Sequence, residues 1–181
     1  MSGNQKGQTL IELIVVIAVS VIVVGALVFA TIASLRNAQF AKNQVQATKL
    51  AQEGIERVRI GRDRNKAITI LGTTNVNSWN GNSSGVGAIW DYQIANGCAS
   101  GISGTACYFK LPPTGESLTY ITSSPTFPDL GTEEFGQFKR AIILNDDSSW
   151  RVQKTVTAIV RWVDFSGDHM SRLTTILRKI Q

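Results

Sequence analysis

The chain has few of the residues from which most catalytic and metal sites are built. It contains one histidine and two cysteines among 181 residues. That supply is too small for the usual four-ligand zinc site of His and Cys side chains. The sequence also shows no glycine-rich phosphate loop, no nucleophile elbow and no pair of buried acids. We therefore expect neither an enzyme nor a bound cofactor.

Proline is also scarce, with four residues and none before Pro112. Because proline is the strongest breaker of helices, its absence permits one uninterrupted helix from Gln8 to about Arg64. At 1.5 Å per residue such a helix would be about 85 Å long.

Charged residues are absent from Leu13 to Ala33, a run of apolar side chains interrupted only by Ser20, Gly25 and Thr31. About 20 apolar residues suffice for a helix to cross a bilayer. Glu12 directly precedes this run, and an unpaired carboxylate in hydrocarbon costs about 2.5–3.5 kcal/mol. We therefore expect Glu12 to have a functional role and to meet a cation.

The residues around Glu12 carry a family resemblance. The stretch Lys6-Gly7-Gln8-Thr9-Leu10-Ile11-Glu12-Leu13, followed by the apolar run, resembles the processing site of type IV prepilins and pseudopilins. The resemblance implies that a prepilin peptidase cleaves after Gly7 and methylates the new amino terminus at Gln8. It also implies that Glu12 pairs with the amino terminus of a neighbouring subunit. Gln8 departs from the Phe or Met that is usual in the family.

The apolar run has two other interpretations. A secretory signal peptide has a shorter apolar core of 7–15 residues and a small-residue cleavage site, for which Val28-Phe29-Ala30 would be tolerable. An ordinary membrane anchor needs neither Glu12 nor the Gly7 junction.

The orientation in the membrane has a conflicting signal. The basic residues Arg36, Lys42 and Lys49 outnumber Lys6, and by the positive-inside rule they favour the orientation opposite to that of a prepilin. The leader resemblance outweighs that bias.

The expected fold class is α+β and pilin-like, with a long N-terminal helix packed on a small antiparallel C-terminal sheet. The predicted segments are a leader at 1–7, a transmembrane and assembly helix at 8–35, an amphipathic half-helix at 36–65 and a β-rich head at 66–181. In the amphipathic half, one stripe should face the sheet, and Glu53 should pair with Arg57 at i,i+4 spacing. The stripe consists of Ala47, Leu50, Ala51, Gly54 and Val58.

The head divides into a variable central region at 66–137 and a C-terminal meander at 138–181. The meander is predicted from alternation over 138–144, over 152–162 and around Leu173–Leu177. Val152 should share the inward face of the second strand, where Lys154 is a misfit. In the central region we expect a loop at 75–87 and short strands at 88–95, 108–111 and 118–122.

The cysteines Cys98 and Cys107 are separated by eight residues. In an exported protein this spacing indicates one local disulfide, worth about 3 kcal/mol. Free thiols in a reducing compartment are the alternative.

The acidic residues of the C-terminal turns have two interpretations. Asp146, Asp147, Asp164 and Asp168 could ligate Ca²⁺ through loop oxygens, as some pseudopilins do in C-terminal loops, but a plain turn-forming role is favoured. No metal is therefore predicted. His169 is expected to be an exposed turn residue, and Trp79 and Trp90 to be buried.

Five cations lie near the predicted helix end, and they could contact DNA. Glu56 and Asp63 dilute them and no aromatic residue accompanies them, so a solvated helix end that suits the helix dipole is favoured. The five are Arg57, Arg59, Arg62, Arg64 and Lys66.

The resemblance predicts the structural subunit of a type IV pilus-like filament. Its partners would be identical or related pilins, the prepilin peptidase and an inner-membrane assembly platform. The chain would lie in the cell membrane before assembly and in an extracellular filament on a prokaryotic surface afterwards. The alternatives are a pseudopilin of a type II secretion system, a minor adhesive or DNA-uptake pilin, and a single-pass anchor carrying a binding domain.

Overall fold

The computed structural model describes residues 5–69, 76–81, 87–91, 107–122, 133–146, 148–149 and 151–180. The chain forms two compact units, Met1–Asn43 and Gln44–Gln181. We refer to the first as the N-terminal unit and to the second as the head, and each is described by itself.

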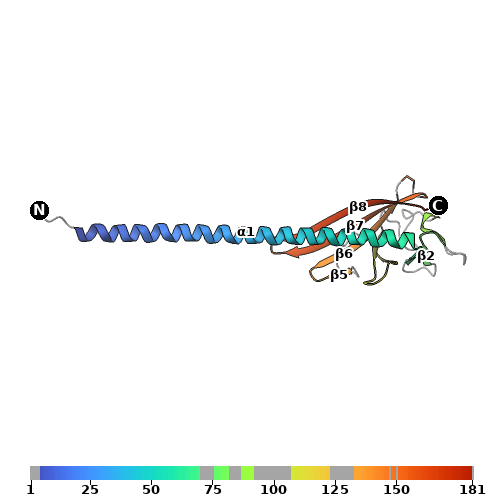
Figure 1. Cartoon of the computed structure of the whole chain (residues 1–181), viewed down its shortest axis with the longest axis horizontal. Helices are drawn as coiled ribbons and strands as arrows, with labels where there is room; N and C mark the ends of the chain where they lie inside the picture. Colours follow the sequence, from blue (N-terminus) through green and yellow to red (C-terminus); the bar gives the residue numbers. More distant parts are fainter. Residues whose placement is uncertain are drawn as a thin grey trace. The chain divides into compact units, whose positions relative to one another are not determined.

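Helix α1, Gln5–Asp63, provides the whole of the described N-terminal unit and continues into the head (Figure 1). This confirms the predicted long helix. The helix ends because Asn65 adopts a left-handed conformation with φ of 49°. The Lys66 amide then donates to Gly61 O at 2.8 Å and the Asn65 amide donates to Arg62 O at 3.1 Å. These two bonds are the Schellman pattern, which satisfies carbonyls in the last turn.

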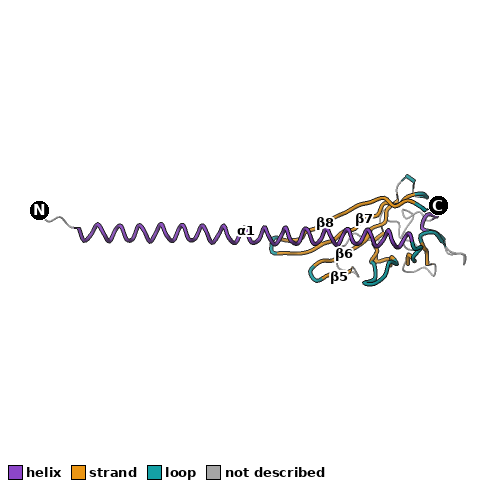
Figure 2. The backbone as a smooth tube through the Cα atoms, viewed as in Figure 1, coloured by secondary structure: helices purple, strands orange, loops and turns teal. Residues whose placement is uncertain are grey.

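The head contains one mixed sheet, shown as strands in Figure 2. Its strand order is β2-β1-β4-β3-β6-β7-β8, and β5 pairs with the same edge of β6 as β3 does. Among the described residues every strand pairing is antiparallel except the short pair β1–β4, and Ser78 of β2 also forms an isolated parallel bridge with Ala88. The strands are β1 Ala67–Thr69, β2 Val76–Ser78, β3 Cys107–Lys110, β4 Leu118–Thr122, β5 Glu133–Phe135, β6 Phe138–Asp146, β7 Gln153–Asp164 and β8 Gly167–Arg178.

The predicted C-terminal meander is confirmed as β6, β7 and β8. Phe138 pairs with Trp162 at one end of β6–β7, and Asp146 pairs with Lys154 at the other. The β7–β8 hairpin closes tightly at Phe165 and Ser166, and Gly167 has a φ of 123° that favours glycine. Val152 was wrongly placed on the inward face. It lies in the turn before β7 and is exposed, because the strand begins one residue later.

The part of α1 in the head covers one face of the sheet. Ala47, Ala51 and Val58 are fully buried, which confirms the predicted stripe. The hydroxyls of Thr48 and Ser171 lie 3.3 Å apart, and Arg62 Nη1 donates to Arg178 O at 3.2 Å. These contacts are about 21 Å apart along the helix and about 23 Å apart along β8. Helix and strand therefore run side by side in the same direction.

The core lies between this helix face and the inward side chains of the sheet. Trp79 and Trp90 are fully buried, as predicted, with ring centroids 5.6 Å apart. Trp162 packs against Phe138 at 5.9 Å. Aromatic pairs of this geometry contribute beyond their buried area.

The central region departs from the prediction in three places. The strand expected at 88–95 is wrong where it is described, because Ile89–Asp91 form a 3₁₀-helix; residues 92–95 lie outside the described part. The loop expected at 75–87 contains β2, and neither β1 nor β5 was predicted. Strands of three residues are too short to show a period of two in the sequence.

Candidate functional site

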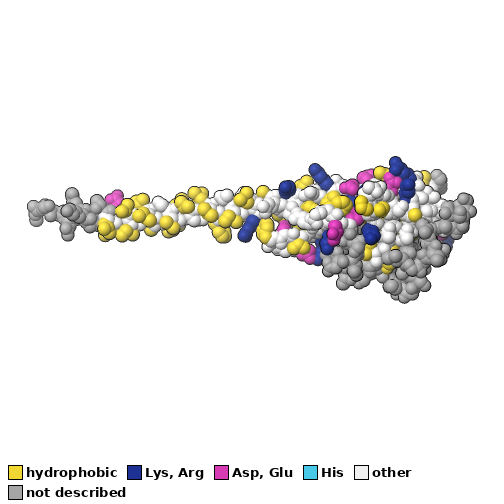
Figure 3. Space-filling view, turned by 90° about the horizontal axis from the view of Figure 1, so that it is seen from below, with side chains coloured by type: hydrophobic (Ala, Val, Ile, Leu, Met, Phe, Trp, Pro, Cys, Tyr) yellow, Lys and Arg dark blue, Asp and Glu magenta, His cyan; other side chains and the backbone are white. Residues whose placement is uncertain are grey.

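The apolar surface of the N-terminal unit is the first candidate site. Every described side chain from Leu10 to Leu35 is exposed. One described helix is long and apolar enough to cross a membrane, with a mean hydropathy of 3.2 in its best 18-residue window and none of that window buried. Figure 3 shows hydrophobic side chains gathered along this helix. A helix that is apolar all round needs lipid or other helices to cover it.

The hydroxyls within the apolar run are satisfied by the helix itself. Ser20 Oγ donates to Val16 O at 2.7 Å, and Thr31 Oγ1 donates to Leu27 O at 2.8 Å. Such back-bonding to the preceding turn removes the penalty of an unpaired donor in lipid. Ser20 and Thr31 therefore need no partner from outside the helix.

Glu12 differs from these hydroxyls. It is exposed, and among the described residues no ion pair or hydrogen bond involves its carboxylate. Its position is five residues after Gly7 on a helical backbone, about 7.5 Å along the axis. Among the described residues of α1, therefore, none supplies a counter-ion for this carboxylate.

Residues 2–28 match the family model of the prokaryotic N-terminal methylation motif. The chain carries the N-terminal signal of a type IV pilin or pseudopilin precursor. Comparison with curated proteins gave no match, and comparison with solved structures gave none either. The motif points to a structural subunit that assembles with other pilins and meets a prepilin peptidase. Motif and apolar helix together fit a membrane-anchored precursor and a surface filament.

Four of the five cations near the end of α1 have ion-pair partners among the described residues, and the fifth, Lys66, is exposed. Arg59 Nη1 lies 2.6 Å from Glu56 Oε1, and Arg64 Nη1 lies 2.6 Å from Glu116 Oε1. The remaining arginines are largely buried. Arg62 pairs with Asp63, and Arg57 pairs with Glu53, as predicted, and donates to the carbonyls of Pro112 and Gly115. These contacts favour the structural interpretation of the cluster over DNA binding.

The candidate calcium ligands are held apart by other partners. Asp146 accepts a bond from Lys154 Nζ at 2.5 Å, and Asp168 pairs with Arg161. Asp164 Oδ1 accepts a hydrogen bond from the Ser166 amide within the β7–β8 turn. Asp147 lies outside the described residues. In the described part of the chain no three acidic, His or Cys side chains gather to hold a metal.

The predicted disulfide keeps the status of a prediction. Cys107 is buried as the first residue of β3. Cys98 lies outside the described residues.

The prediction that His169 is an exposed turn residue is wrong. His169 lies on β8 and its ring stacks on Trp162 at 5.4 Å. Its Nε2 lies 2.9 Å from both Asp164 Oδ1 and Ser166 Oγ. Hydrogen bonds from the Ser166 hydroxyl and amide, together with His169, hold the pKa of the Asp164 carboxyl below its ordinary value. The hydrogen bonds among Asp164, Ser166 and His169 therefore stabilise the β7–β8 turn.

A buried ion network joins α1 to the sheet and was not predicted. Arg140 on β6 is fully buried, and its Nη2 lies 2.6 Å from Glu133 Oε2 on β5. Its Nη1 donates to Leu50 O at 2.7 Å. Arg57 lies 3.7 Å from the other Glu133 oxygen. Burial raises the pKa of Glu133, and the two guanidiniums only partly oppose that shift.

Proposed function

We propose that this chain is a structural subunit of a type IV pilus-like filament, cleaved after Gly7 and assembled through its N-terminal helix. One observation carries the proposal. The methylation motif leads directly into the N-terminal unit, where the apolar surface of the helix is exposed and Glu12 is the one acidic residue of that unit's sequence. A chain that stayed in the membrane would gain nothing from that carboxylate.

Cleavage after Gly7 exposes the amine of Gln8, a positive charge next to lipid. Glu12 of an incoming subunit pairs with that amine on a subunit already in the filament. Each of the two charges is costly in hydrocarbon when alone. Pairing lowers the cost of both, whereas leaving either unpaired is strongly unfavourable. The pair therefore sets the axial register between subunits.

Assembly transfers the helix surface from lipid to neighbouring helices. A β-carbon added at Gly25 would have no neighbouring atom within 4 Å, so no packing in the unit requires a glycine there. Glycine weakens a helix interior by about 0.5–1 kcal/mol relative to alanine. Local unwinding during assembly should therefore centre on Gly25.

The first test is intact mass and N-terminal sequencing of protein sheared from the surface of cells that carry a prepilin peptidase. The proposal expects a chain that starts at Gln8 and carries one added methyl group. A chain that starts at Met1 and stays in the membrane fraction would overturn it in favour of a single-pass anchor. The filament length seen by electron microscopy separates a pilus subunit from a secretion pseudopilin.

The second test addresses the role of Glu12. Glu12→Gln should be cleaved normally and should enter filaments poorly, because the amine of Gln8 loses its counter-ion. Ser20→Ala is the matched control, since it also alters a polar residue in the apolar run, but one whose hydroxyl is bonded within the helix. Normal filament yield from Glu12→Gln would exclude charge pairing.

A further inference from the structure

The outer face of the β7–β8 hairpin carries a pocket that the assembly helix does not use. The pocket has a volume of about 380 Å³, within the usual range for small-ligand sites. Its β8 residues Asp168, Met170 and Arg172 lie on the sheet face opposite α1, because they alternate with the inward-facing Ser171 and Leu173. His169 shares the face of Ser171 and stacks on Trp162. The pocket lining consists of Tyr108, Ile159, Arg161, Asp168, His169, Met170 and Arg172.

The pocket has an apolar floor. Ile159 is almost fully buried, while Met170 is about half exposed. In the sheet register Ile159 is opposite Arg172, and Arg161 is opposite Met170. The polar residues therefore lie next to an apolar surface, as in sites that bind one face of a ring and the substituents at its edge.

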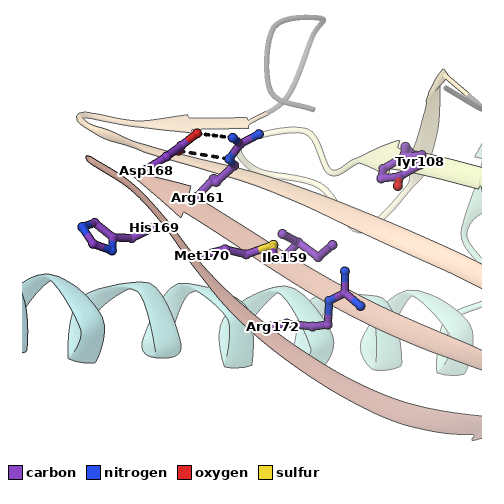
Figure 4. Close-up of a pocket in the computed structure, with 7 residues that line it drawn as sticks. All are labelled: Tyr108, Ile159, Arg161, Asp168, His169, Met170 and Arg172. Atoms are coloured by element: carbon purple, nitrogen blue, oxygen red, sulfur yellow. Dashed lines mark hydrogen bonds and ion pairs between the residues drawn. The ribbon is translucent and has the colours of Figure 1, made fainter. Parts of the chain in front are cut away.

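The charged residues of the pocket differ in how they are held. Arg161 Nε donates to Asp168 Oδ1 at 3.1 Å, and its Nη2 pairs with the other carboxylate oxygen. Figure 4 shows these two side chains pointing toward each other while the His169 ring points away from the other labelled residues. Arg172 is exposed, and no described residue forms an ion pair with it. Its guanidinium can therefore bind an anion from outside.

The positions of Asp168 and Arg172 restrict the chemistry of a ligand. Both residues are on the outer face of β8 with Met170 between them, so their Cα atoms are about 13 Å apart. Asp168 still has acceptor capacity, because a carboxylate offers about four lone-pair sites and Arg161 uses two. A small inorganic anion held by Arg172 would be too short to reach Asp168 and would leave the acceptors of that carboxylate unused. A ligand with a carboxylate at one end and hydroxyl donors at the other satisfies both groups.

From this arrangement we propose that the pocket binds an acidic sugar unit of an extracellular polysaccharide. Arg172 holds the sugar carboxylate, since guanidinium and carboxylate match as a bidentate pair. Asp168 accepts from ring hydroxyls, and Tyr108 supplies a phenolic hydroxyl and an apolar ring face. Ile159 and Met170 contact the C–H face of the sugar. The site would give the head a binding activity separate from assembly.

The test is binding of a galacturonic acid trisaccharide to the full chain in detergent, measured by calorimetry. The neutral galactose trisaccharide, succinate and L-alanine serve as comparison ligands. The proposal expects the acidic trisaccharide to bind at least about tenfold more tightly than each of the three. No measurable binding, or equal binding of any comparison ligand, overturns it. Succinate would indicate a general anion site, and L-alanine a site for zwitterions.

Variants identify the residue responsible. Arg172→Gln should weaken binding of the acidic trisaccharide by about tenfold or more, because a charge-assisted bond is lost. Arg178→Gln, at an exposed arginine on the same strand outside the pocket, should leave the affinity within about twofold. Met170→Ala should weaken acidic and neutral sugars alike. An unchanged affinity in Arg172→Gln would overturn the proposal.

Discussion

Arg140 donates from Nε to Glu133 Oε2 at 2.6 Å, and this bond links a fully buried guanidinium on β6 to a nearly buried carboxylate on β5. The Arg140 guanidinium also lies 4.7 Å from the centre of the Phe135 ring. Through its bond to Leu50 O it reaches the helix that covers the sheet. Arg140 therefore links β5, through Glu133 and Phe135, to β6 and to helix α1.

Removing one member of this pair should be far more harmful than removing both. Arg140→Met leaves Glu133 buried without its main partner, and we expect a loss of about 3–5 kcal/mol in the free energy of unfolding. The double variant Arg140→Met/Glu133→Gln should recover most of the loss, since no unpaired charge remains. Urea denaturation followed by tryptophan fluorescence measures both. Additive effects in the double variant would contradict the coupling.

The Lys154–Asp146 pair gives a second prediction. Lys154 is fully buried near the start of β7, and its Nζ donates to Asp146 Oδ1 on β6 at 2.5 Å. Asp146→Asn should destabilise the head strongly, because it leaves a buried ammonium without its counter-charge. Lys154→Met in turn leaves the nearly buried Asp146 carboxylate without its cation, so it should also destabilise the head. The double variant Lys154→Met/Asp146→Asn should recover most of either loss, and additive shifts of the urea midpoints would contradict this coupling.

The fold was predictable where the sequence repeats a period over many residues. The helix and each of the three strands of the meander contain nine residues or more, and the sequence pattern predicted all of them. The same alternation placed Lys154 on the inward face, but it could not reveal that Asp146 would be opposite. Arg140 gave the same signal, because it shares its face of β6 with Phe138 and Ile142, and it was overlooked.

The candidate sites divide in the same way. Gly7, Gln8 and Glu12 are close together in the sequence, so a contiguous motif is enough to predict their roles without knowledge of the fold. The pocket on the outer face depends on Tyr108 from β3 and on β7 and β8 together, and no short pattern brings those strands together. The alternation of Asp168, Met170 and Arg172 was the one available signal. It indicates a solvent face but not what that face binds.

Acid should loosen the β7–β8 turn. The pKa of the Asp164 carboxyl is held below its ordinary value, first by the Ser166 hydroxyl and further by the Ser166 amide and His169. A lowered pKa in the folded state means that the carboxylate stabilises the fold above its ordinary pKa and that this contribution disappears as the pH falls through the folded value. Asp164→Asn should therefore differ most from the unaltered chain at pH 6 and least near pH 3. A constant difference in unfolding free energy across that range would exclude the ionised carboxylate as the cause.

Gly25 and Gly61, both on α1, should respond differently to the same substitution. A β-carbon at Gly61 would lie 2.5 Å from Glu116 O, a backbone atom that cannot move aside without shifting the chain after β3. Gly61→Ala should therefore destabilise the head by about 1–3 kcal/mol. Gly25→Ala meets no atom within 4 Å, so it should leave the unfolding of the head unchanged and strengthen the helix by about 0.5–1 kcal/mol.

The same pair of variants separates folding from assembly. If local unwinding at Gly25 accompanies extraction from the membrane, Gly25→Ala should lower the filament yield although its head is as stable as that of the unaltered chain. Gly61→Ala should lower the yield only to the extent that it lowers the amount of folded protein. Comparing the sheared-filament yield per folded molecule for the two variants distinguishes these causes. An undiminished yield from Gly25→Ala would place the flexibility needed for assembly elsewhere in the helix.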